Sequence, residues 1–367
     1  QTNNGMPMFF RAPEYAKTNS EMVDYARNYL NAYEAAIGSA DFTTEYNGQT
    51  VHYTDLFDMD SLLRYWLLCE YTNNWDSMKN SSYLYKDLEG KAKMGPAWDY
   101  DWAWGNINMY SMTGPFVYDQ WHTTLTGMDT NAGGFAEVAY QKQQWNRYLI
   151  KDPYFVTKAY EFYKKYRPTV IEDMIKDGGT IDTLESKYQK ASEVNDQKWS
   201  DTYGLYRGKA FVNGIETNTQ SQNYNDAIAS MKTFIEKRVQ WMDQQFNSVQ
   251  ALYSSMGNTV SNQISVSADK DESGTVTATA EVKDSSVSSV VFLVNGKKVL
   301  ANNSAYVPVI DGKASVVVDS ALLETVAGAL NTVEELAVNG SQSYINDMMN
   351  FTTFTAEVEN PGPVEPA

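Results

Sequence analysis

Residues 73–106 read NNWDSMKNSSYLYKDLEGKAKMGPAWDYDWAWGN. The stretch begins with a polar loop, and its alternating SYLYKD segment predicts a strand. LEGK predicts a turn, and AKMGPAW predicts a second short strand. Because the two strands of a hairpin start and end at the same edge, the loop before the hairpin and the segment after it should meet in space.

Helical patterns surround this hairpin. The segment before it, LLRYWLLCEY, is apolar nearly all round and predicts a core helix that ends near Tyr71 and is capped by Asp58 or Asp60. An amphipathic helix is expected at 19–37. Further helices are expected at 136–177, 181–199 and 224–246, with Pro153 and Pro168 as starts or breaks.

The composition changes near residue 255. All nine tryptophans precede this point, and the text after it is rich in Val, Ser, Thr and Ala. Five strand-like segments with intervening turns predict an immunoglobulin-like β-sandwich, although residues 331–350 fit no regular pattern. We therefore expect an α+β protein with a mainly helical domain at 1–254, a sandwich at 255–358 and a linker tail at 359–367.

Composition also excludes several function classes. The chain has 367 residues, with 29 Lys and Arg against 46 Asp and Glu, a net charge of −17. An acidic protein of this kind lacks the basic footprint of a nucleic-acid binder. Its single cysteine, Cys69, excludes an internal disulfide and a cysteine-based zinc cluster, and we expect it to be an inert core residue. No stretch is long and apolar enough for a membrane span, and the start QTNNGMPMFF is unlike a signal peptide.

Chemistry-bearing residues concentrate around the hairpin. Asp76 and Asn80 lie on the preceding loop, and Asp99 and Asp101 follow the second strand. Hard divalent cations such as Mg²⁺ bind carboxylate and amide oxygens together with phosphates and water. An Asp, a nearby Asn, a strand pair and a second Asp form the layout of a kinase-type phosphotransfer site. Each of these residues also has a structural interpretation, as a turn former or a backbone cap.

The pattern N-x-D-x-x-x-N…YLY-x-D…G-P-x-W-D-x-D-x-A-x-G-N resembles the CotH kinase family, named after a spore coat protein and found in many bacterial secreted proteins. WNRYLIKDPYF, NDQKW and KTFIEKRVQWMDQQF extend the resemblance over roughly residues 15–247. The resemblance implies an atypical protein-kinase-like fold that phosphorylates protein Ser or Thr hydroxyls, using ATP with Mg²⁺ or Mn²⁺. Asp76 would be the catalytic aspartate, Lys79 a phosphate contact, and Asn80, Asp99 and Asp101 metal ligands.

Two features depart from a complete kinase. The spacing from Asp76 to Asn80 is one residue shorter than the general kinase loop D-x-x-x-x-N. The residues before 55 read as helix, without a Gly-rich loop or a strand carrying a phosphate-pairing Lys. We therefore expect the nucleotide-binding lobe to lie upstream of Gln1, and the chain by itself to be inactive.

Two other functions fit the sequence. The chain could be a non-catalytic cell-surface binding, adhesion or structural protein on a degenerate kinase scaffold, with Trp98, Trp102 and Trp104 as a glycan-stacking platform. Alternatively, Asp99 and Asp101 could be a glycosidase pair, although two carboxylates on one short segment are poorly placed to flank a glycosidic bond. The expected partner is a protein substrate or a cell-surface molecule, and the expected location is the cell exterior.

Overall fold

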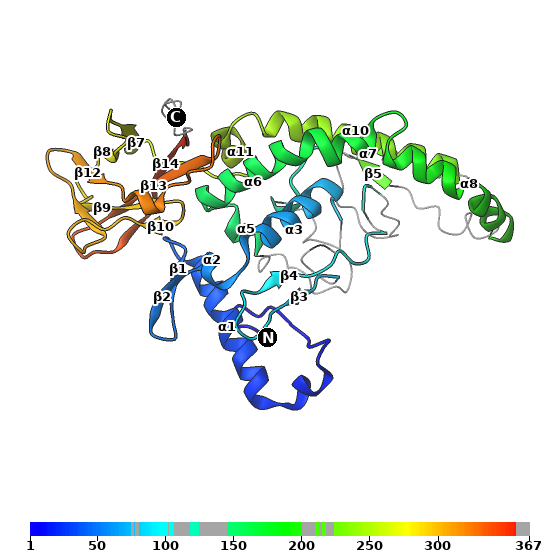
Figure 1. The fold of residues 1–367 in the computed structure, drawn as a ribbon, viewed down its shortest axis with the longest axis horizontal. Helices are drawn as coiled ribbons and strands as arrows, with labels where there is room; N and C mark the ends of the chain where they lie inside the picture. The colour runs from blue at the N-terminus through cyan, green and yellow to red at the C-terminus, as the bar shows by residue number, and fades with distance from the viewer. Residues whose placement is uncertain are drawn as a thin grey trace, which may run out of the picture. The chain divides into compact units, whose positions relative to one another are not determined.

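The computed structural model describes residues 1–74, 77, 81–101, 103–105, 118–124, 145–199, 210–212, 215–217 and 224–356 (Figure 1). Helices and strands are mixed, which confirms the α+β class. The chain divides into two compact units. The first contains Gln1–Glu34, Thr54–Leu149 and Phe162–Met256, and the second contains Ala35–Tyr53, Ile150–Glu161 and Gly257–Ala367. Two segments that precede residue 254 thus group with the later strands, and the predicted domain limits stay a prediction.

Helices dominate the first unit, and most expected ones are present. They are η1 (Glu14–Thr18), α3 (Met59–Thr72), η2 (His122–Thr124), α5 (Asn146–Leu149), α7 (Glu172–Ile175), α8 (Thr180–Lys198), α10 (Tyr224–Gln245) and α11 (Val249–Ser255). α8 and α10 contact each other (Figure 1). The described residues of the unit also form two short hairpins, β3 (Leu84–Tyr85) with β4 (Lys93–Met94) and β5 (Ala210–Val212) with β6 (Ile215–Thr217).

Two long helices have parts in both units. α1 (Ser20–Gly38) matches the amphipathic helix expected at 19–37. α6 (Pro153–Tyr166) starts at Pro153, where the missing proline N–H removes no helical hydrogen bond. The helical path continues through Pro168. A π-helical turn, η4 (Arg167–Ile171), contains this proline and connects α6 to α7.

α3 is the core helix predicted from its apolar sequence. Nine of its side chains are buried, including the fully buried Trp66 and Cys69. Its N-terminus is capped by Asp58, whose side chain accepts a hydrogen bond from the backbone N–H of Ser61 at 2.8 Å. Cys69 is buried in the core, as expected, and burial raises the pKa of its thiol to about 12.

Asp58→Ala should lower the free energy of unfolding by about 1 kcal/mol, because one N-terminal amide of α3 loses its acceptor. Asp60→Ala removes an exposed ion pair with Arg64 and should cost only about 0.3 kcal/mol. Urea unfolding followed by circular dichroism compares the two. Equal losses would show that Asp58 is not the working cap.

Residues 43–52 differ from the helix expected in this region. They form an antiparallel hairpin of β1 (Thr43–Tyr46) and β2 (Gln49–His52). Asn47 and Gly48 connect the strands with φ of 52° and 77°, the left-handed values that a tight hairpin turn requires. The Asn-Gly pair is the local signal for this turn, and it outweighs the weak helical pattern of short flanking segments.

Besides the β1–β2 hairpin, the described residues of the second unit form two antiparallel sheets. The larger has the order β10-β9-β13-β14, with β11 also paired to β9, and the smaller has the order β12-β8-β7. The strands are β7 (Ile264–Lys270), β8 (Val276–Val282), β9 (Ser289–Val294), β10 (Lys297–Lys298), β11 (Tyr306–Pro308), β12 (Lys313–Val317), β13 (Leu330–Val338) and β14 (Tyr344–Thr355). One apolar core includes Ala278 of β8, Phe292 of β9 and Val333 of β13, so it draws on both sheets. An immunoglobulin-like fold remains a prediction.

β13 and β14 fill the stretch that showed no regular pattern. Nearly all of β13 is buried on both faces, so its sequence does not alternate between apolar and polar residues. It also carries two adjacent acids, Glu334 and Glu335, both fully buried. Because side chains alternate along a strand, Glu335 faces the shared core with Val333 and Ala337, while Glu334 faces the opposite side.

Glu335→Leu should raise the free energy of unfolding by about 3 kcal/mol at pH 7. Burial raises the pKa of Glu335 to about 8 from its ordinary 4.5, and neither carboxyl oxygen has a hydrogen-bond partner among the described residues. The folded chain therefore binds this proton more tightly than the unfolded chain, and the stability present below 4.5 is lost as the pH rises through about 8.

Urea unfolding at about pH 5 and about pH 8 tests this, because leucine cannot ionise and its advantage should grow with pH. Glu281→Gln is the matched control, because Glu281 is an exposed acid of β8 that pairs with Lys313 at the surface. A gain that is the same at both pH values would contradict the buried-acid explanation.

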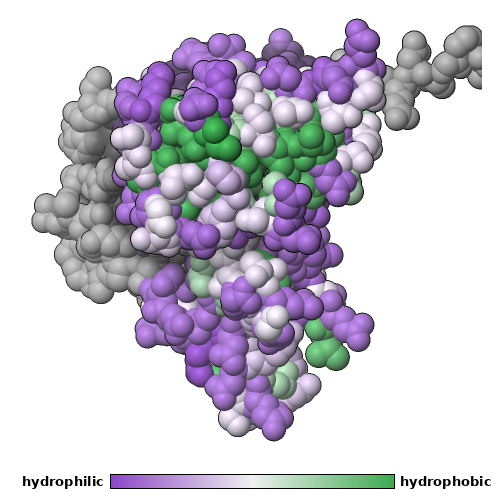
Figure 2. Space-filling model, turned by 90° about the vertical axis from the view of Figure 1, so that its left-hand side faces the viewer, coloured by the Kyte–Doolittle hydropathy of each residue, from purple (hydrophilic) through white to green (hydrophobic). Residues whose placement is uncertain are grey.

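Part of the apolar content of the second unit stays at the surface. Figure 2 shows green apolar areas interrupted by hydrophilic surface on the face it presents. The exposed aliphatic side chains of the unit include Val260, Leu300, Ile310, Val317 and Val326. No helix in the described ranges is long and apolar enough to cross a membrane.

Candidate functional site

The β3–β4 hairpin brings together the two segments that the sequence places on either side of it. The backbone N–H of Gly95 donates to the Tyr83 carbonyl at 2.6 Å, directly beyond the paired strands. The backbone N–H of Trp104 donates to the carbonyl of Thr72, in the last turn of α3, at 2.7 Å. The expected meeting of loop and post-hairpin segment is therefore confirmed for the described residues.

Asp99 contacts a residue at each end of the loop that precedes the hairpin. The side-chain amide of Asn74 donates to its carbonyl oxygen at 3.4 Å, and the Ser81 hydroxyl donates to its carboxylate at 3.4 Å. Asn74 and Ser81 are the described residues nearest the two ends of the loop that holds Asp76, Lys79 and Asn80. Asp99 itself is exposed and left-handed, with φ of 62°, so its carboxylate is accessible to a ligand from solvent.

Three of the five predicted site residues lie outside the described residues. These are Asp76, Lys79 and Asn80. Asp101 is described and exposed, two residues beyond Asp99. Within the described ranges, no group of three His, Cys, Asp or Glu side chains is placed to hold a metal ion. The proposed ligand set therefore stays a prediction that joins described and undescribed positions.

Tyr100 anchors the segment that carries the two aspartates. Its ring is largely buried, and its hydroxyl lies beside Cys69 of α3 and the buried Ser77. Burial raises the pKa of the Tyr100 hydroxyl, with the neighbouring thiol as a further cause, so the hydroxyl stays neutral. With Tyr100 turned inward, its two aspartate neighbours are exposed.

The predicted aromatic platform is divided in the structure. Trp98 is 59% exposed and meets the ring of Tyr83 edge-on, with centroids 6.1 Å apart. Trp104 instead packs against Tyr71 of α3, with centroids 5.9 Å apart. Trp102 lies outside the described residues. Of the two described tryptophans, Trp98 therefore has the exposure that ligand stacking needs, whereas Trp104 contributes to packing.

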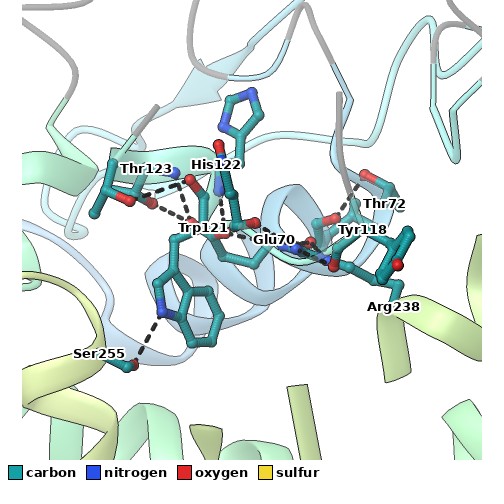
Figure 3. A network of polar contacts seen from close by, with 11 residues as sticks. Glu70, Thr72, Tyr118, Trp121, His122, Thr123, Arg238 and Ser255 are labelled. Atoms are coloured by element: carbon teal, nitrogen blue, oxygen red, sulfur yellow. Dashed lines mark hydrogen bonds and ion pairs between the residues drawn. The ribbon is translucent and has the colours of Figure 1, made fainter. Parts of the chain in front are cut away.

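A buried ion pair supports the end of α3 (Figure 3). Glu70 and Arg238 of α10 are both fully buried, with 3.4 Å between their charged atoms. Arg238 also donates to the backbone carbonyls of Glu70, Tyr118 and Gln120. The Glu70 carboxylate accepts from the backbone N–H groups of His122 at 2.7 Å and Thr123 at 2.9 Å.

Burial opposes the charge on both partners of this pair. It raises the pKa of Glu70, while Arg238 and the donors of Thr123 and His122 act in the opposite direction. Burial also lowers the pKa of Arg238 to about 10, so the guanidinium still carries its charge at neutral pH. The network ties 118–124 and α10 to the last turn of α3, immediately before the loop that holds the predicted catalytic residues.

Sequence reasoning did not identify this network. The available signal was Glu70 itself, an acid inside a helix that is otherwise apolar nearly all round, because a buried charge requires a partner. Nothing local indicated that the partner is Arg238, which lies 168 residues away.

Comparison with known proteins adds the family. A sequence model described as CotH kinase protein matches residues 10–242, well over half of the chain. The chain belongs to the CotH kinase protein family. No curated protein and no solved structure matches it.

The CotH region includes the hairpin, all five predicted site residues and both partners of the Glu70–Arg238 pair. It ends within α10, so β7 to β14 lie outside the match. Asp99 of the CotH region is exposed and lies beside the loop, and Asp101 is exposed two residues further along the chain. This segment is therefore the candidate functional site of the CotH region.

Proposed function

We propose that the CotH region of this protein is a phosphotransferase that moves the γ-phosphoryl group of ATP to Ser or Thr hydroxyls of a protein. The observation that carries the proposal is the position of Asp99, an exposed carboxylate beside both ends of the Asp76–Asn80 loop. A carboxylate after a hairpin and an Asp–Asn loop before it are the parts that phosphoryl transfer requires for its metal and its nucleophile.

The donor chemistry fits a divalent cation. Mg²⁺ is held in proteins by one or two carboxylates, with water and substrate phosphates completing its shell. Asp99 and Asp101 are exposed acids separated by the anchored Tyr100, and Asn80 supplies a third oxygen in the proposal. Bound there, the cation would neutralise charge on the transferred phosphoryl group. Mn²⁺ has the same preference for oxygen ligands.

The chain's own residues have separate tasks in this proposal. Asp76 accepts the proton of the substrate hydroxyl, Lys79 contacts a phosphate, and Asp99 with Asp101 and Asn80 holds the metal. The Glu70–Arg238 network holds the last turn of α3 in place, from which the Asp76 loop departs. The protein acts outside the cell in this proposal, on the strength of the resemblance to secreted bacterial members.

Calorimetric titration of the full-length protein with ATP tests the proposal. Binding should require Mg²⁺ or Mn²⁺ and disappear when EDTA removes the metal, because the carboxylates repel unscreened phosphates. Transfer of labelled phosphate to a mixture of Ser- and Thr-containing proteins is the second readout. A folded full-length protein that binds no ATP with either metal would refute the proposal.

A further inference from the structure

The larger sheet of the second unit has a buried outer face. A second apolar cluster covers it, formed by Val291 and Leu293 of β9 with Leu336 and Val338 of β13. Alternation along β13 places Glu334 on this same side, away from the shared core. Segments of the CotH region within the unit reach this sheet. The Tyr344 hydroxyl donates to Asp41 at 2.7 Å, for example.

Asp152, just before α6, also belongs to this unit and is fully buried. Both of its carboxyl oxygens already accept hydrogen bonds. The Tyr53 hydroxyl donates to one at 2.6 Å, and the backbone N–H of Tyr154 donates to the other at 2.8 Å. Asp152 is therefore well suited to carry a negative charge, because its donors satisfy a carboxylate.

Glu334 is the other carboxyl of the site. It is fully buried and lies within hydrogen-bonding reach of Asp152. Neither of its oxygens accepts a hydrogen bond of ordinary geometry from the described residues. Two carboxylates are both acceptors, so this contact becomes a hydrogen bond only when one of them holds a proton. Since the oxygens of Asp152 are already satisfied by donors, Glu334 is the group that holds it.

Among the described residues, the basic side chains near this pair have contacts of their own. His52 packs against the Tyr53 ring in a tilted arrangement, with centroids 4.3 Å apart. Lys158 is committed to Glu161 and Glu324, each at 3.0 Å. Burial raises the pKa of Asp152 to about 6, and burial together with the Asp152 charge raises the pKa of Glu334 well above its ordinary value. Both directions fit a shared proton.

We propose that Asp152 and Glu334 form a proton-operated clasp, in which one shared proton fastens residues 150–161 of the CotH region to β13. The proton lies on Glu334 and is donated to the Asp152 carboxylate. Losing it leaves two buried negative charges in contact, which favours separation of the segment from the sheet. The clasp makes this packing sensitive to alkaline pH, and it does not depend on the proposed phosphotransfer.

The sign of the effect follows from proton linkage. The closed clasp binds one more proton than the open one, so its stability is complete at acidic pH and falls as the pH rises. Each pH unit in that window should increase the opening equilibrium constant by up to about tenfold. Hydrogen exchange of peptides covering 150–161, corrected for the intrinsic pH dependence of exchange, measures this on the intact protein.

Glu334→Gln should abolish the pH dependence, because its amide donates to Asp152 at every pH. Asp152→Asn is the second variant, since its amide can donate to an ionised Glu334 and should likewise remove the slope. Glu335→Leu is the matched control on the same strand, and it should keep the slope at 150–161. The clasp is refuted if Glu334→Gln exchanges with the wild-type slope, or if Glu335→Leu alone removes that slope.

Discussion

Asp99→Asn is expected to reduce metal-dependent phosphotransfer of the full-length protein by about 100-fold or more. A metal supplies several kcal/mol of transition-state stabilisation, and each 1.4 kcal/mol corresponds to about tenfold in rate. Asparagine retains an oxygen ligand but loses the negative charge that attracts the cation. Its small polar side chain tolerates the left-handed backbone at this position, where φ is 62°.

The fold should not change in this variant. Asp99 is exposed, and the hydrogen bond from Asn74 goes to its backbone carbonyl, which the substitution keeps. Asp87→Asn is the matched control, because Asp87 is an exposed aspartate in the turn of the same hairpin. Rates at saturating ATP and a Mg²⁺ titration provide the measurement. Wild-type activity in Asp99→Asn, or an equal loss in Asp87→Asn, would remove Asp99 from the site.

Arg238→Met should lower the free energy of unfolding by about 3–5 kcal/mol, the range for breaking one side of a buried ion pair. Methionine fills similar space but leaves the Glu70 carboxylate buried without its counter-ion. Carbonyls of Glu70, Tyr118 and Gln120 also lose a donor. Arg64→Met is the control, since Arg64 pairs with Asp60 at the surface and its loss should cost about 0.5 kcal/mol.

Urea unfolding at several pH values separates a charge effect from a packing effect. Without Arg238, the pKa of the buried Glu70 should rise further, so the stability of Arg238→Met should decline as the pH increases. A second substitution, Glu70→Gln, removes the uncompensated charge and should recover part of the loss. A loss no larger than that of Arg64→Met, or no recovery by Glu70→Gln, would contradict the ion-pair explanation.

The fold was predictable where one local pattern had one structural outcome. The apolar run and Asp58 predicted α3. Alternating residues around a Gly-containing turn predicted the β3–β4 hairpin. The hairpin at 43–52 was missed because its strands have only four residues each. Such short segments give a weaker periodic pattern than the helical sequences beside them. β13 was missed because two buried acids interrupt a strand whose faces are both covered.

The candidate site was predictable to a different degree. Sequence placed Asp99 and Asp101 directly after the hairpin, and the structure shows both exposed there, with Asp99 beside the loop. It did not indicate that Tyr100 anchors the segment between them, because an aromatic residue in such a segment can be either buried or exposed. It also missed the network that holds the preceding helix turn, whose members come from α3, α10 and residues 118–124.

The sequence by itself determined the family, the secondary elements with strong periodicity and the residues that could do chemistry. These follow from side-chain type and short-range spacing, both of which can be read directly from the amino-acid sequence. Tertiary structure decided which charges meet, as Glu70 meets Arg238. The physical reason is that a buried charge reveals its need for a partner locally, whereas the partner's identity depends on which distant segment the fold packs against it.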